Sequence, residues 1–140
     1  IGLYMVEQLP ILSPSTYTQD DVAFINKRVL QLIYTSWSMA PFAKDFGVDG
    51  PPFLWDATRR DQLRAELDAY YALLYGLTRE ELQYILDPQS GMGPDFPGET
   101  FRVLKTNEIK AYGEYRTARL VLEAYDSLAA EWARPAEPTA

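Results

Sequence analysis

The sequence predicts a mainly α-helical domain of about five helices with a short strand remnant at its N-terminus. Apolar residues recur at helical spacing in several segments, and Thr18 and Thr78 each precede acidic residues in the pattern that caps a helix start. Runs of glycine and proline separate these segments. With 140 residues and 47% apolar content, the chain is long enough for one such domain with its own core.

The first residues differ from the rest of the chain. Residues 1–12 begin IGLYMVEQLPI, with bulky side chains that suit a strand, and Pro10 lacks the amide needed to continue a ladder. Because the chain starts inside this apolar stretch without an initiator Met, we expect a fragment of a longer protein. We expect residues 13–133 to form the helical domain and residues 134–140 to form a flexible tail.

The first predicted helix covers roughly residues 18–36, and a shorter one covers residues 41–46. Gly47 suits a left-handed stop after the second helix. Gly50-Pro51-Pro52 predicts an extended linker, since a residue before a proline is disfavoured in the helical region. The buried face of the first helix is expected to hold Val22, Ile25, Val29, Leu32 and Ile33.

Asp56 begins the longest predicted helix, which ends at Gly76. The capping box at Thr78 opens another helix that runs to about Leu86. The apolar stripe of the longest helix is expected to hold Leu63, Leu67, Tyr70 and Leu74.

The segment PQSGMGPDFPGE, from Pro88 to Glu99, is predicted to be a loop, and its role is open. The residues that follow, up to about residue 132, are expected to form one bent helix or two helices joined near Gly113. Their buried side is expected to hold Ala118, Val121, Leu122, Tyr125 and Leu128.

Composition excludes several kinds of chemistry. The chain has no Cys and no His, which removes disulfides, thiolate nucleophiles, the usual zinc sites and the ordinary base near neutral pH. No apolar run approaches the roughly 18–20 residues that span a bilayer. The net charge of −7 opposes general attraction to nucleic acid but permits a local basic face. We expect a cytoplasmic protein without a metal site and without a membrane partner.

The stretch VDGPPFLWD resembles the catalytic loop of enzymes that methylate adenine, which reads Asn or Asp, Pro, Pro, then Tyr or Phe. In that loop a side-chain oxygen accepts a hydrogen bond from the flipped base. Gly50 stands at this position and has no side chain, and no Gly-rich turn precedes it to hold a methyl donor. We therefore predict no catalytic residue and no bound cofactor in this chain. The carboxylate pairs Asp20-Asp21 and Glu80-Glu81 stand at predicted helix starts, where capping explains them better than acid–base catalysis.

Basic residues gather in two stretches of this acidic chain. One stretch lies near the start of the longest helix, and the other lies in the last helical region. Such residues could contact DNA phosphates without reading the base sequence. The candidate phosphate ligands are Arg59, Arg60, Arg64, Lys105, Lys110, Arg116 and Arg119.

Two simpler interpretations stand beside these candidates. Arg64 with Asp68, and Arg119 with Glu123, can form ion pairs at i,i+4 spacing on an ordinary solvated helix surface, which the residues taken alone favour. The clustered tyrosines could stack on unpaired bases, but packing between helices explains them better. These tyrosines are Tyr70, Tyr71, Tyr75, Tyr84, Tyr112 and Tyr115.

Four phrases in a fixed order carry a more specific signal, and they extend over roughly Leu9 to Asp126. They are QLPILSPSTYT, LRAELDAYYALLYGLTREELQYILD, PGETFRVLK and YGEYRTARLVLEAYD. Together they resemble the C-terminal end of large bacterial adenine-specific DNA methyltransferases of restriction–modification and phage-defence systems, including type IIG, BREX and DISARM proteins.

The resemblance implies a methylase domain that binds S-adenosylmethionine, then a target recognition domain, then a helical segment like this one. Residues 1–12 would then be the exit strand of the recognition domain. None of the family's catalytic or cofactor residues falls on this chain. We therefore expect a non-catalytic segment that supports target recognition and positions double-stranded DNA within the parent protein, with or without a restriction activity there.

A different class of function remains open. The chain could be a protein–protein docking module of a defence complex, without direct DNA contact. An exposed apolar patch beside an acidic surface would favour this alternative.

Overall fold

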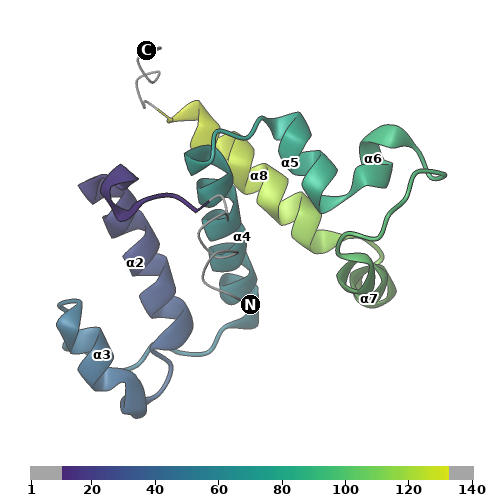
Figure 1. Ribbon diagram of the computed structural model, residues 1–140. Helices are drawn as coiled ribbons and strands as arrows, with labels where there is room; N and C mark the ends of the chain where they lie inside the picture. Colours follow the sequence, from purple (N-terminus) through teal and green to yellow (C-terminus); the bar gives the residue numbers. More distant parts are fainter. Residues whose placement is uncertain (1–10, 133–140) are drawn as a thin grey trace, which may run out of the picture. The chain divides into compact units, whose positions relative to one another are not determined.

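The computed structural model describes residues 11–132 (Figure 1). Within them it contains seven α-helices, two 3-10 helices and no strand. The mainly helical fold is thus confirmed, although about five helices were expected. The predicted strand remnant falls almost entirely outside the described residues, and residues 11 and 12 belong to no strand. The predicted tail over residues 134–140 also lies outside them.

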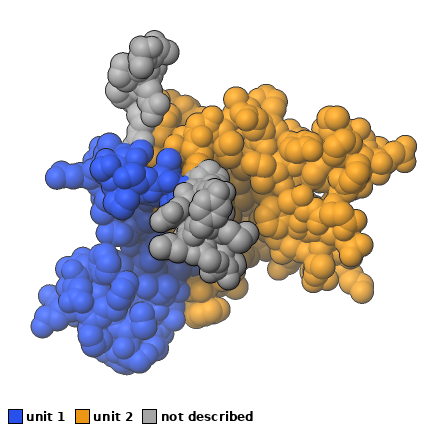
Figure 2. All heavy atoms as spheres, viewed as in Figure 1, with its two compact units in different colours: residues 1–53 blue, residues 54–140 orange. Residues whose placement is uncertain are grey.

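The chain divides into two compact units, Ile1–Phe53 and Leu54–Ala140 (Figure 2). The boundary lies one residue after Gly50-Pro51-Pro52, where the sequence predicted a linker. Residues 51–56 are in no helix, as a proline-restricted linker requires. Each unit has its own cluster of buried apolar side chains.

In the first unit, α2 (Gln19–Ile33) begins at a capping box. The Asp21 N–H donates to Thr18 Oγ1 at 3.1 Å, and the Thr18 N–H donates to Asp21 Oδ2 at 2.8 Å. These bonds satisfy two amides at the helix start, and they confirm that the helix begins at Thr18. The other elements of this unit are η1 (Pro14–Thr16), η2 (Trp37–Met39) and α3 (Ala40–Asp45).

Helix α2 ends at Ile33, three residues before the expected end. Tyr34 accepts a backbone hydrogen bond from the Phe53 N–H at 2.8 Å, so its carbonyl is not used for another helical turn. The Tyr34 hydroxyl also donates to the Gly50 carbonyl oxygen at 2.8 Å. Tyr34 is buried with Leu30 and Ala43 in the core of this unit. Val22, which the sequence placed on the buried face, is instead 45% exposed.

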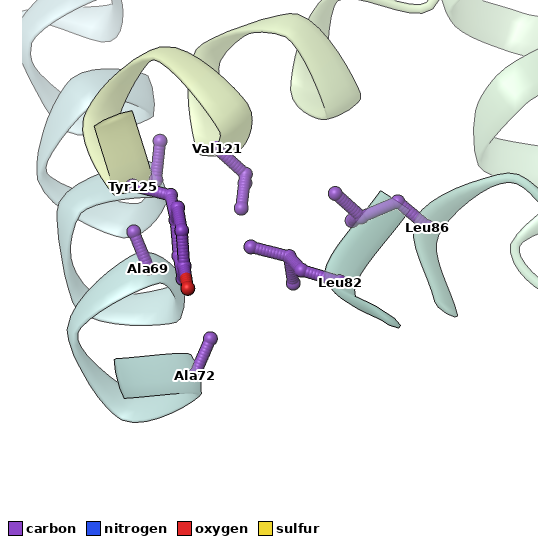
Figure 3. Packing of buried hydrophobic residues seen from close by; sticks show 7 residues of the cluster. Ala69, Ala72, Leu82, Leu86, Val121 and Tyr125 are labelled. Carbon is purple, nitrogen blue, oxygen red and sulfur yellow. The ribbon is translucent and has the colours of Figure 1, made fainter. Parts of the chain in front are cut away.

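The second unit contains the five remaining helices. Figure 1 shows α8 with α4 on one side and α5 on the other, and α7 lies against α8 as well. Their bounds are α4 (Ala57–Leu74), α5 (Arg79–Leu86), α6 (Pro88–Met92), α7 (Arg102–Tyr112) and α8 (Arg116–Ala130). Figure 3 shows side chains of α4, α5 and α8 meeting in the core of this unit. The buried cluster comprises Ala65, Ala69, Ala72, Leu82, Leu86, Val121 and Tyr125.

The face of α4 in this core differs from the predicted stripe. Leu63, Tyr70 and Leu74 are buried as expected, but Leu67 is only partly buried. The side chains of α4 in the cluster with α8 are alanines, which let two helix backbones approach closely. On α8, Val121 and Tyr125 are buried, whereas Ala118, Leu122 and Leu128 pack around them half-buried.

The expected loop from Pro88 begins with the short helix α6. Pro88 stands at its first position, where the missing amide costs no hydrogen bond, and Gly93 with φ 99° follows its end. The last region forms two helices, α7 and α8, because Gly113 ends α7 in the left-handed conformation with φ 75°. These differences give more helices than the sequence predicted. No helix among residues 11–132 is long and apolar enough to cross a membrane.

Candidate functional site

An apolar hollow lies on the outer side of α5. It has a volume of about 370 Å³ and is lined by Leu77, Glu80, Glu81, Tyr84 and Ile85. We call this site the α5 hollow. Tyr84 is 50% exposed and Ile85 is 42% exposed. Large apolar side chains therefore face solvent beside two glutamates.

The local sequence explains why α5 is apolar on two sides. Leu82 and Leu86 point into the core, as Figure 3 shows, so the intervening Tyr84 and Ile85 point outward. Tyr84 also contacts the ring of Phe96 edge to face, with 6.0 Å between ring centroids. The outward aromatic side chain is thus held by the segment that follows α6.

The rim of the α5 hollow is fixed by the capping box at Thr78, which confirms the predicted helix start. The Glu81 N–H donates to Thr78 Oγ1 at 3.2 Å, and the Thr78 N–H donates to Glu81 Oε1 at 3.0 Å. The hydrogen bond that the Thr78 backbone donates to the Glu81 carboxylate is the main cause that holds the pKa of Glu81 below its usual value. The Tyr125 hydroxyl donates a 2.7 Å hydrogen bond to the Leu77 carbonyl oxygen and so fixes the position of Leu77. These hydrogen bonds therefore fix the backbone at Leu77 and Thr78, beside the hollow.

A second concavity lies where α4, α7 and α8 meet, and we call it the three-helix pocket. Its volume is about 360 Å³. Its charged lining residues are Asp61, Arg64, Asp68, Glu108 and Arg116, and its other lining residues are Ala65, Leu104, Tyr112, Thr117 and Leu120.

Most charges of the three-helix pocket have structural partners. The Glu108 carboxylate, which is buried, accepts the Thr117 N–H through both oxygens at 2.9 and 3.2 Å. It takes the place of a capping side chain at the start of α8, where Tyr115 supplies none. Arg116 lies 3.6 Å from Asp61 and over the Tyr112 ring at 4.9 Å.

Arg64 and Asp68 differ from the other charged residues of the three-helix pocket in their contacts. The sequence suggested an ion pair between them, but no hydrogen bond or ion pair joins the two, or joins either to another described residue. As a whole residue Asp68 keeps more than a third of its surface exposed, although it lines the pocket. Burial of its carboxyl group nevertheless raises its pKa, and the charge of Arg64 opposes that rise.

Two other candidate phosphate ligands are engaged within the second unit. Lys105 Nζ lies 3.0 Å from Asp87 and donates to Gln89 Oε1 at 3.3 Å, which ties α7 to the α5–α6 corner. Arg119 binds Glu114 at 3.0 Å and Glu123 at 3.1 Å, so the predicted pair with Glu123 is confirmed. The carboxylate of Glu114, and then that of Glu123, raises the pKa of Arg119.

The remaining candidates lie on helix surfaces. Arg59 donates to Gln62 at 3.5 Å and lies 3.7 Å from Glu66. The guanidinium of Arg60 stacks on the Trp55 ring, 3.7 Å from its centroid. Lys110 is exposed in the last turn of α7. The structure therefore brings Arg64 and Arg116 to one pocket and leaves the other candidates apart from it.

The tyrosines fall into several environments. Tyr70 is buried and contacts the Trp132 ring edge to face, at 5.2 Å between centroids. Tyr84 and Tyr112 line the two concavities, while Tyr71 and Tyr75 are exposed. The Tyr115 hydroxyl is buried and has no hydrogen-bond partner among residues 11–132. Burial, followed by the charges of Glu108 and Asp87, raises the pKa of Tyr115 to about 12.

Sequence reasoning did not find the α5 hollow, the capping role of Glu108 or the buried Tyr115 hydroxyl. A signal for the hollow existed, because Tyr84 and Ile85 adjoin the core positions Leu82 and Leu86 and cannot share their face. No comparable signal identified Glu108, since its partner is a backbone amide on another helix. Among residues 11–132, no group of three or more His, Cys, Asp and Glu residues is arranged to hold a metal ion.

Comparisons with family models, with curated proteins and with solved structures returned no match for this chain. The function is therefore inferred from the geometry of the two concavities and from the resemblance carried by the four sequence phrases.

Proposed function

We propose that this chain is a non-catalytic helical docking module whose α5 hollow binds a basic amphipathic segment on the surface of a partner domain. The observation that carries the proposal is the exposed apolar surface of Tyr84 and Ile85, with half-buried Leu77 beside them, next to Glu80 and Glu81. Exposed apolar surface with a charged rim is typical of interaction sites. Carboxylates on the rim select a partner with Lys or Arg beside its apolar residues, and the net charge of −7 acts in the same sense.

The resemblance to adenine-specific DNA methyltransferases suggests where such a segment comes from. In a parent of that family, the methylase domain would bind S-adenosylmethionine and methylate DNA in the bacterial cytoplasm. The helical module would hold the methylase and recognition domains in position through the α5 hollow. Its role would be the orientation of domains, with the chemistry performed elsewhere in the parent.

The internal contacts of the basic residues support docking over direct DNA binding. Lys105 and Arg119 are bound by carboxylates, and Arg116 lies close to one. A phosphate would have to compete with these partners for the same donors. The best-placed candidate ligands therefore support the helical scaffold.

DNA contact is a second candidate function, which one observation favours. Arg59, Arg60 and Arg64 lie within two turns at the start of α4, and Arg59 has only long contacts, at 3.5 and 3.7 Å. Such a row could contact the backbone of double-stranded DNA in the parent protein. Removal of each arginine that binds a phosphate should then reduce the slope of log affinity against log salt by about one. An unchanged slope in an Arg59→Ala, Arg64→Ala parent would exclude this role.

The docking proposal is tested with the full chain and a fluorescent helical peptide that carries Leu on one face and Lys on the other. Ile85→Lys places a cation in the hollow and should weaken peptide binding at least about tenfold, or 1.4 kcal/mol. Glu80→Gln should weaken binding less and flatten its salt dependence. Val103→Lys is the matched control, because Val103 is 68% exposed on α7, away from the hollow.

Fluorescence anisotropy measures all four proteins under the same salt conditions. Equal peptide affinity for Ile85→Lys and for the unchanged chain would contradict the proposal. An equal reduction in Val103→Lys would also contradict it, because binding would then depend on total charge rather than on the hollow.

A further inference from the structure

The charges of the three-helix pocket are unevenly satisfied. The Glu108 carboxylate accepts a hydrogen bond from the Thr117 amide, and Asp61 lies 3.6 Å from Arg116. Glu108 is thus satisfied by a backbone amide and Asp61 by a guanidinium, both inside the second unit. They contribute to the walls of the pocket and hold α4, α7 and α8 together.

Arg64 and Asp68 carry opposite charges that influence each other without direct contact. They are one turn apart on α4 and line the same pocket, yet no hydrogen bond or ion pair joins them. Side chains at this spacing have Cβ atoms about 5–6 Å apart. One ligand carrying two close, opposite charges can therefore reach both heads at once.

The rest of the lining is suited to an apolar body. Leu104 of α7 and Leu120 of α8 face the pocket with Ala65 of α4, and the Tyr112 ring stands at its edge. Leu104 is 40% exposed and Tyr112 is 56% exposed, so both have surface left to cover. A volume of about 360 Å³ lies at the small end of the range for ligand pockets.

We propose that the three-helix pocket binds a small zwitterion with an aliphatic body, of the class of the aliphatic α-amino acids. The ligand carboxylate binds the Arg64 guanidinium, the ammonium group binds the Asp68 carboxylate, and the side chain packs against Leu104 and Leu120. The raised pKa of Asp68 agrees with a carboxylate that gains from a cationic partner. This site is separate from the α5 hollow and does not depend on docking there.

The charge balance of the lining disfavours a nucleic-acid ligand. Three carboxylates, of Asp61, Asp68 and Glu108, stand against two guanidinium groups, of Arg64 and Arg116. A strand of phosphates would bring several negative charges to a pocket that is already acidic. A zwitterion adds no net charge and offers each of Arg64 and Asp68 a group of opposite charge.

The test uses NMR titration of the isotope-labelled full chain with three probes of one carbon skeleton. L-leucine carries both charges, 4-methylpentanoate carries only the carboxylate, and 3-methylbutylamine carries only the ammonium group. Saturable shifts at amides of α4, α7 and α8 are expected for L-leucine, which should bind at least about tenfold more tightly than either single-charge probe.

Two variants assign the contacts. Arg64→Gln should weaken the binding of L-leucine and 4-methylpentanoate and leave 3-methylbutylamine binding unchanged. Asp68→Asn should weaken the binding of L-leucine and 3-methylbutylamine and leave 4-methylpentanoate binding unchanged. Arg59→Gln, outside the pocket, is the control and should change nothing. Both changed side chains are exposed, and amide spectra without ligand check that the fold is kept. Equal affinity for all three probes, no saturable shift with L-leucine, or unchanged L-leucine binding in both variants would overturn the proposal.

Discussion

The Tyr125 hydroxyl of α8 donates a 2.7 Å hydrogen bond to the carbonyl oxygen of Leu77, in the turn between α4 and α5. Tyr125 belongs to the buried core, and Leu77 lines the α5 hollow. One contact therefore links the packing of α4, α5 and α8 to the surface proposed for docking.

Tyr125→Phe should reduce the free energy of unfolding by about 1 kcal/mol. The ring still fills the core, but the half-buried Leu77 carbonyl oxygen loses its donor. Urea denaturation followed by circular dichroism measures this change. An unchanged midpoint would show that the hydrogen bond contributes nothing net.

Tyr115→Phe should change the free energy of unfolding in the opposite direction, because the buried Tyr115 hydroxyl has no partner among the described residues. We expect no loss of stability or a gain of up to about 1 kcal/mol, since an unsatisfied polar group is removed. The same urea experiment compares the two tyrosine variants directly. A loss as large as that of Tyr125→Phe would contradict the assignment of Tyr115 as unsatisfied.

Alkaline pH gives a second test of the buried Tyr115 hydroxyl. The folded chain holds the pKa of Tyr115 at about 12, above its ordinary value of 10.0, so the folded state keeps the proton longer than the unfolded state. Stability is therefore full below pH 10 and falls as the pH rises towards 12. Tyr115→Phe should lose less stability over this window than the unchanged chain. Parallel losses in both proteins would argue against the pKa shift.

Glu108→Ala should cost about 1–3 kcal/mol, because the start of α8 loses its carboxylate acceptor. Glu108→Gln keeps an acceptor without the charge and should cost less. Thermal unfolding of both variants measures the difference. A smaller cost for the alanine variant than for the glutamine variant would contradict the capping role.

The caps at Thr18 and Thr78 were predictable from sequence because a capping box involves residues only three positions apart. Gly113 was predictable as a helix end for the same local reason. Helix α6 was missed because its glycine and proline content favoured a loop, although Pro88 suits a first helical position.

Contacts between helices were less accessible to sequence reasoning. Leucines on α4 were expected to form its main buried stripe, but Ala65, Ala69 and Ala72 meet α8, and alanine carries little periodic signal. The seven basic candidates looked alike in sequence, yet Lys105 and Arg119 have carboxylate partners whereas Arg64 has none among the described residues. The choice of partner depends on tertiary packing, which spacing alone does not determine.

The most direct test of docking at the α5 hollow is site-specific crosslinking, which the absence of cysteine from the chain makes simple. Ile85→Cys and, separately, Val103→Cys are labelled with a benzophenone and irradiated with the basic amphipathic peptide. Docking at the hollow predicts a peptide adduct from position 85, suppressed by excess unlabelled peptide, and little adduct from position 103. Equal adducts from both positions, or none from position 85, would contradict it.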